Sequence, residues 1–90
     1  MIPRSIRFTP AQADQTESGL IGFVNFVADG WQFDGVQVRR KSAGGLRLKF
    51  QSRIDNNGIE RFPVSPINSH VRSECETAVF THLRNRGLIP

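Results

Sequence analysis

Alternating apolar and polar residues in the first two thirds of the chain predict a series of short β-strands. Ser5–Thr9 places Ile6 and Phe8 on one side, and a proline that ends the strand follows. Leu20–Ala28 (LIGFVNFVA) is apolar at both odd and even positions, which is typical of a strand covered on both faces. The core or a second subunit must cover these two faces, and we expect a contact between subunits at this strand.

The next strand is predicted to form a hairpin and to carry a bulge. Asp29-Gly30 is the strongest turn signal in the chain, because glycine accepts the positive φ that tight hairpin turns require. The following strand, Trp31–Arg39 (WQFDGVQVR), carries its apolar side chains first at odd and then at even positions. A strand can change parity only by gaining a residue, so we place a β-bulge at Asp34-Gly35.

Leu46–Gln51 (LRLKFQ) alternates without interruption, which predicts a half-buried strand. If it pairs with the preceding strand, five apolar side chains share the core face of the hairpin: Val36, Val38, Leu46, Leu48 and Phe50. A turn at Asp55–Gly58 and a short strand at Ile59–Phe62 are expected to follow.

At Ile67 the spacing changes to that of a helix. Apolar residues then recur mostly three or four positions apart, along one face of a helix of about five turns: Ile67, Val71, Cys75, Ala78, Val79 and Leu83. Asn68 or Ser69 can cap its first turn, and Gly87 fits the residue that ends it. The pattern predicts one domain over residues 1–90, with strands within residues 5–62 and a helix at about 67–86.

Length and composition agree with one small domain, because 90 residues leave no room for two independent cores. The single cysteine, Cys75, excludes an internal disulfide and fits a reducing compartment. No apolar run approaches the ~18 residues of a membrane span, and Met1–Pro10 lacks the apolar stretch of a signal peptide. We therefore expect a cytoplasmic protein without a membrane partner.

The net charge of +4 hides a local concentration of cations. Half of the 12 lysines and arginines lie in a stretch without any acidic residue: Arg39, Arg40, Lys41, Arg47, Lys49 and Arg53. Strand alternation gathers part of this set, with Gln37, on the face opposite the core: Arg39, Arg47 and Lys49. Three others extend the basic surface at the two ends of the hairpin: Arg40, Lys41 and Arg53.

Like charges opposed across strands destabilise a sheet by up to ~1 kcal/mol per pair, so folding alone does not explain this cluster. A polyanion such as nucleic acid is the natural partner. Two alternatives remain open: the cations are solvated or protect a sheet edge, or they bind an acidic protein.

Two further groups have both a structural and a functional interpretation. Trp31, Phe33 and Phe62 could stack on bases, although aromatic residues in so small a domain are more often core. The helix start at Asn68-Ser69, with Arg72 one turn in, could hold a phosphate. The alternative is a plain N-cap, with Arg72 paired to Glu76.

The sequence carries no signature of catalysis or metal binding. His70 and His82 lie twelve positions apart with Cys75 between them, which is not a zinc spacing. Ser73, His70 and Glu74 are neighbours on one helix and cannot adopt the geometry of a catalytic triad. No glycine cluster matches a phosphate-binding loop. We expect no enzyme activity, no metal, no cofactor and no small-molecule substrate.

Three segments resemble the SpoVG family, the stage V sporulation protein G or septation-regulator proteins of bacteria. They are DGWQFDGVQV at Asp29–Val38, FQSRIDNNG at Phe50–Gly58, and Pro66-Ile67-Asn68-Ser69 with Arg72 three residues on. The last resembles the family's helix-start motif P-I-N-S-x-x-R and is the most specific. The similarity extends over about 80 of the 90 residues.

The resemblance implies an α+β fold, in which a bent antiparallel sheet of four to five strands carries one C-terminal helix and the chain forms a homodimer. The family's basic pair after the fourth strand falls on Arg53 and Ile54, so only one cation is kept. Arg47 and Lys49 are cations that this chain adds. The remaining matches fall on the turn and the helix start: Arg61, Asn68, Ser69 and Arg72.

Members of that family bind DNA and RNA and regulate septation, sporulation and virulence, so the resemblance implies a regulatory nucleic-acid-binding protein. We expect phosphate contacts from seven cations: Arg39, Arg40, Lys41, Arg47, Lys49, Arg53 and Arg72. The alternative function is a non-enzymatic module that docks an acidic partner of the cell-division machinery.

Overall fold

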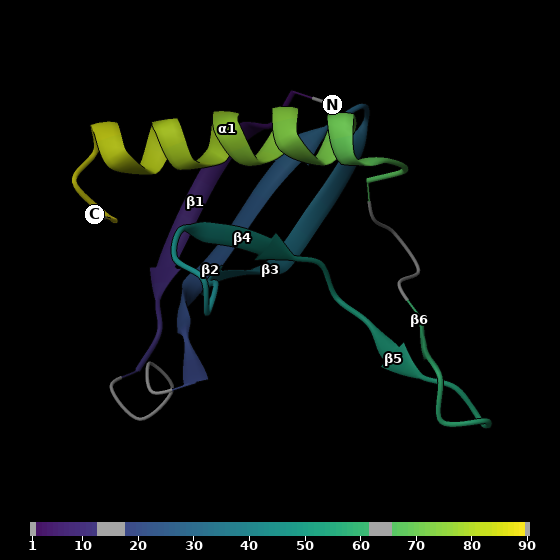
Figure 1. The fold of residues 1–90 in the computed structure, drawn as a ribbon. Helices are drawn as coiled ribbons and strands as arrows, with labels where there is room; N and C mark the ends of the chain where they lie inside the picture. Colours follow the sequence, from purple (N-terminus) through teal and green to yellow (C-terminus); the bar gives the residue numbers. More distant parts are fainter. Residues whose placement is uncertain (1, 13–17, 62–65, 90) are drawn as a thin grey trace.

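The computed structural model describes residues 2–12, 18–61 and 66–89. Four antiparallel strands form one sheet in the order β1-β2-β3-β4, and a two-stranded ribbon, β5–β6, extends from it (Figure 1). The strands and the single helix have these bounds: β1 Arg4–Pro10, β2 Leu20–Ala28, β3 Trp31–Arg40, β4 Leu46–Lys49, β5 Arg53–Ile54, β6 Glu60–Arg61 and α1 Ser69–Asn85. The predicted α+β architecture, with one sheet and one C-terminal helix, is confirmed.

The β2–β3 hairpin has the predicted turn and the predicted bulge. Asp29 and Gly30 both have positive φ, 54° and 79°, between the paired residues at the strand ends. Further along, Val24 lies opposite Val36 and Phe26 lies opposite Phe33, so β3 uses one residue more than β2 over this interval. Gly35 has a φ of 66°, and its N–H donates to Asn25 Oδ1 at 2.8 Å, which holds the extra residue in place.

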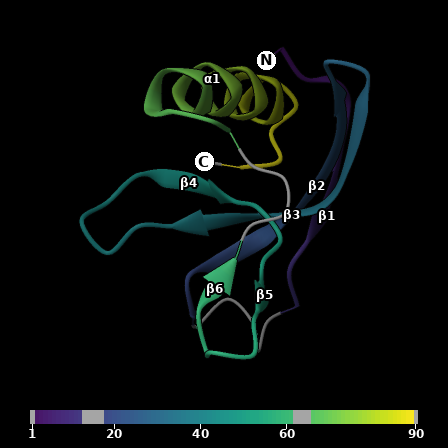
Figure 2. The ribbon, with the colours of Figure 1, turned by 90° about the vertical axis from the view of Figure 1, so that its right-hand side faces the viewer.

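The sheet bends around α1, which covers one of its faces (Figure 2). The core between them consists of residues from β2, β3, β4, the residue after β4, α1 and the C-terminal segment: Val24, Phe26, Ala28, Val36, Val38, Leu48, Phe50, Cys75, Val79, Phe80, Leu83 and Ile89. The predicted core face of the β3–β4 hairpin is therefore confirmed, with Leu46 only half-buried at its end.

Two side chains of α1 bind the outer edge of β4. Glu76 Oε2 accepts from the Leu48 N–H at 2.7 Å, and Arg72 Nη1 donates to the Leu48 carbonyl oxygen at 2.8 Å. Arg72 and Glu76 lie 3.8 Å apart, one turn from each other on the helix. Together they satisfy both backbone groups of one edge residue, as a neighbouring strand would. We call this pair the clamp. It holds β4 against α1 and thereby fixes the position of the strand that carries Arg47 and Lys49.

The strand count and the helix start differ from the prediction. The segment before the Asp55–Gly58 turn forms a strand of its own, β5, so the described residues contain six strands. Strand β6 begins at Glu60, one residue after the predicted Ile59, and Phe62 lies outside the described residues. Ile67 was wrongly predicted to lie on the buried helix face, since it is 88% exposed. Asn68 is the extended N-cap and accepts from the Val71 N–H at 2.9 Å, so the helix begins only after Ile67.

Strand β2 is fully covered on one face only. Leu20, Gly22, Val24, Phe26 and Ala28 are buried toward the core, whereas the intervening residues are half-buried, or exposed at Asn25. Within the described ranges, no helix is both long and apolar enough to cross a membrane.

We predict that Glu76→Ala lowers the free energy of unfolding by about 1–3 kcal/mol, because it leaves the Leu48 N–H without its acceptor. Denaturant unfolding measures the loss, and hydrogen exchange at Leu48 should accelerate. Glu76→Gln keeps an oxygen at the same place and should lose clearly less. Equal losses for the two variants would contradict the clamp.

Candidate nucleic-acid interface

The face of the sheet opposite α1 carries residues from all four strands, and we call it the outer face (Figure 2). The strand register aligns Thr9, Phe23, Gln37 and Lys49 in one row across β1, β2, β3 and β4. Because paired residues point to the same side of a sheet, the row places a half-buried phenylalanine among polar neighbours and one cation.

Next to this row, Arg39 on β3 lies directly opposite Arg47 on β4, as predicted. Arg39 is restrained, because its guanidinium donates to Gln37 Oε1 at 2.9 Å and to the Ser18 carbonyl oxygen at 2.7 Å. Arg47 is exposed, and no acid in the described part of the chain pairs with it. Two arginines thus face each other across the β3–β4 pair, one restrained by two hydrogen bonds and the other exposed.

The two arginines border a shallow hollow of about 360 Å³ at the β3–β4 turn. Its described lining contains four of the predicted cations and two serines, and no acidic residue among the residues that the structure describes: Ser18, Arg39, Arg40, Lys41, Ser42 and Arg47. Cationic side chains and hydroxyl groups are the donors that phosphate oxygens accept from in proteins. The hollow, which we call the basic hollow, is therefore suited to an anion.

Lys49 lies at the other end of the outer face, and an acidic residue from outside the basic stretch lies next to it. Its Nζ lies 3.9 Å from Glu60 Oε2, which also accepts from Ser52 Oγ at 2.8 Å. The β5–β6 ribbon brings Glu60 back toward β4, a contact that strand alternation cannot reveal. Both side chains are partly exposed, 34% and 44%, so the pair is weak and Lys49 can exchange it for a phosphate.

Two cations of the outer face were missed at the sequence level. Arg7 on β1 lies opposite Asn25, and Arg4 lies opposite Val27, and both arginines are exposed. The available signal was the alternation of Arg7 with Ile6 and Phe8, which puts it on the polar side of its strand. The pairing of β1 with β2, needed to join it to the other cations, was not predicted.

The remaining predicted cations lie elsewhere. Arg72 belongs to the clamp on the α1 side of the sheet, and its guanidinium carbon lies 5.9 Å from the centre of the Phe50 ring. The helix start is therefore a capped N-terminus with an Arg72–Glu76 pair, the structural alternative weighed above. Arg53 opens β5, opposite Arg61 in the ribbon, and both side chains lie outside the described part of the structure.

The three aromatic residues considered for base stacking have different positions in the structure. Trp31 is 64% exposed, so the expectation that it belongs to the core is wrong; it directly follows the Asp29-Gly30 turn of the β2–β3 hairpin. Phe33 is half-buried, with its ring centre 5.2 Å from that of Phe26 and 5.9 Å from that of Phe50. Phe62 lies outside the described residues.

Cys75 is fully buried in the core. Burial, followed by the negative charge of Glu76, raises the pKa of its thiol to about 11. The thiol therefore stays protonated at neutral pH and offers no thiolate nucleophile. Within the described ranges, no group of His, Cys, Asp and Glu is arranged to hold a metal ion.

The raised pKa of the Cys75 thiol predicts that the free energy of unfolding depends on pH. In the unfolded chain it ionises near its ordinary pKa of 9.0, whereas in the folded protein it keeps its proton until about pH 11. The wild type should therefore lose stability as the pH rises through this interval, and Cys75→Ala should lack that loss. Denaturant unfolding at several pH values measures this effect: the difference in the free energy of unfolding between wild type and Cys75→Ala should narrow as the pH rises from 9 to 11. A difference that stays constant over this range would contradict a raised pKa of the Cys75 thiol.

No family model, no curated protein and no solved structure matches this chain. The resemblance of its short motifs to the SpoVG family therefore stays a prediction.

Proposed function

We propose that this chain binds the phosphate backbone of DNA or RNA through its outer face, without enzymatic activity. The observation that carries the proposal is the basic hollow, where Arg39 opposes Arg47 beside Arg40 and Lys41, with no acid in the part of the lining that the structure describes. Like charges on paired strands destabilise the sheet, and binding of a polyanion would neutralise them. Such binding explains why the chain carries these cations together.

The outer face extends this binding surface along the sheet. Lys49 continues it along β4, and Arg4 and Arg7 add cations on β1, so a strand of nucleic acid can follow the face across the sheet. Phosphate contacts carry no sequence information by themselves, so we expect weak sequence preference. A cytoplasmic regulatory role in septation or sporulation is the part of the proposal that depends on the family resemblance alone.

We further propose that the protein is a homodimer. The outer side of β2, where we expected the subunit contact, carries Phe23 and Val27 between the cations, so a contact there would compete with phosphate. The β5–β6 ribbon is the better candidate, because Ile54 and Ile59 are 63% and 47% exposed on it. A two-stranded ribbon is at best marginally stable alone and gains from packing against a second copy.

The dimer proposal predicts that Ile54→Asp, combined with Ile59→Asp, yields a folded monomer in sedimentation measurements. Burying two unpaired aspartates in the dimer interface would cost much free energy. In the monomer the same two residues stay exposed on the ribbon and cost little. A wild type that is monomeric at all concentrations, or a double variant that stays dimeric, would contradict this arrangement.

The salt dependence of binding tests the phosphate contacts. The logarithm of the binding constant should fall linearly with the logarithm of the salt concentration, by about 0.7 per phosphate contact on single strands and about 0.9 on duplex DNA. Arg47→Gln and Lys41→Gln should each weaken binding and reduce the magnitude of this slope by roughly one contact.

Arg86→Gln is the matched control, because it removes the same charge from an exposed residue at the far end of α1. It should leave the slope nearly unchanged. An equal effect of all three substitutions would mean that net charge alone drives binding, and a flat salt dependence would refute the proposed function. If polyglutamate binds as tightly as nucleic acid, the result would favour an acidic protein as the partner.

A further inference from the structure

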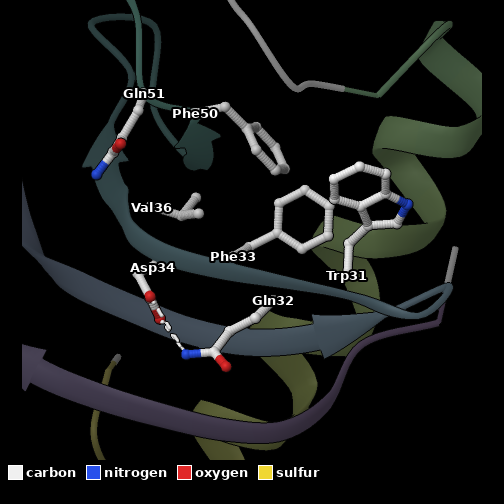
Figure 3. Close-up of a pocket in the computed structure, with 7 residues that line it drawn as sticks. All are labelled: Trp31, Gln32, Phe33, Asp34, Val36, Phe50 and Gln51. Carbon is white, nitrogen blue, oxygen red and sulfur yellow. Dashed lines mark hydrogen bonds between the residues drawn. The ribbon is translucent and has the colours of Figure 1, made fainter.

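Trp31 forms one wall of a small aromatic cleft near the turn of the β2–β3 hairpin. The cleft measures about 150 Å³, and the rings of Trp31, Phe33 and Phe50 lie side by side along it (Figure 3). Gln51 also lines the cleft, whereas the Gln32 and Asp34 side chains point to the other side of β3 (Figure 3). We call it the Trp31 cleft. An exposed tryptophan beside a half-buried and a buried phenylalanine places an apolar patch on the surface of a small domain.

The floor of the cleft is held by the core. Phe33 stacks on Phe26 with an angle of 26° between the rings and meets the edge of Phe50, which is buried under Arg72. The bulge makes room for Gln51 at the cleft, because Gly35 lacks the Cβ that would approach Gln51 Nε2 to 2.9 Å. The cleft is therefore largely preformed in the free protein.

The chemistry of the lining favours a flat, uncharged ring over a phosphate group. The described lining contains three aromatic residues and no lysine or arginine that could bind a phosphate. Gln51 offers both a hydrogen-bond donor and an acceptor beside the aromatic rings. Nucleobases combine a π-face that stacks on aromatic side chains with edges that donate and accept.

The cleft is continuous with the outer face. A second hollow, of about 220 Å³, shares Phe50 and Gln51 with it and is lined on its far side by Gln37 and Lys49. β4 pairs with β3 only as far as the Gln37–Lys49 pair, so the two hollows meet where the sheet edge opens. A nucleic-acid strand with a phosphate on Lys49 can place a neighbouring base in the cleft.

We propose that the Trp31 cleft binds one unpaired nucleobase of a single-stranded RNA or DNA whose phosphates lie on the outer face. The inference rests on the proposed function and adds a preference for single strands, because a base inside a duplex cannot reach the cleft. Base stacking on Trp31 supplies this selectivity, whereas the cations bind single strands and duplexes alike.

The chain contains one tryptophan and no tyrosine, so its indole fluorescence reports on Trp31 alone. Titration with a single-stranded oligonucleotide, as RNA and as DNA, should quench this fluorescence. A duplex of the same length and inorganic polyphosphate should bind with little quenching. Trp31→Ala should weaken single-strand binding about 5- to 100-fold, with duplex binding and the salt slope unchanged, and Trp31→Phe should keep most of the affinity.

The outcomes separate this inference from the proposed function. If Trp31→Ala binds single strands like the wild type while Arg47→Gln does not, the cleft assignment fails and the phosphate-binding face stands. Equal quenching by duplex also overturns the cleft. If Trp31→Ala converts a dimer to a monomer, a second copy occupies the cleft instead. If the wild type binds no nucleic acid at low salt, both proposals fail.

Discussion

The β-bulge at Asp34-Gly35 is the constraint on which both surfaces of this protein depend. Without the extra residue, Phe33 would share a face with Gln37 and Arg39, and the aromatic residues would leave the core side of the sheet. With it, β3 places Phe33 on the side of α1 and Gln37 and Arg39 on the outer face. The Asn25 side chain and the positive φ of Gly35 hold this arrangement.

The features that could be predicted are those set by local chemistry. The Asp29-Gly30 turn and the bulge follow from backbone preferences and from a change of parity within one strand. The opposition of Arg39 and Arg47 follows from the alternation of two adjacent strands joined by a short turn. For these elements the sequence neighbours are also the spatial neighbours, so a pattern read along the chain predicts the contact.

The features that were missed depend on distant parts of the chain. Glu60 returns to Lys49 through a ribbon whose direction no local pattern encodes. Arg7 joins the outer face only through the pairing of β1 with β2. Trp31 is exposed because the core ends before the strand does, and Ile67 because Asn68 caps the helix one residue later than the apolar spacing indicates. Long-range register and the extent of the core decide these positions.

The most direct test of the account is a nuclear magnetic resonance titration of the isotope-labelled protein with a single-stranded oligonucleotide at about 50 mM salt. We predict that the backbone amides around Arg39, Arg47 and Lys49 and the indole N–H of Trp31 shift together, while the exposed side of α1 at Ser73 and Thr77 does not respond. Shifts confined to α1, or no shifts at this salt concentration, would contradict the claim that the bulge creates a nucleic-acid-binding surface.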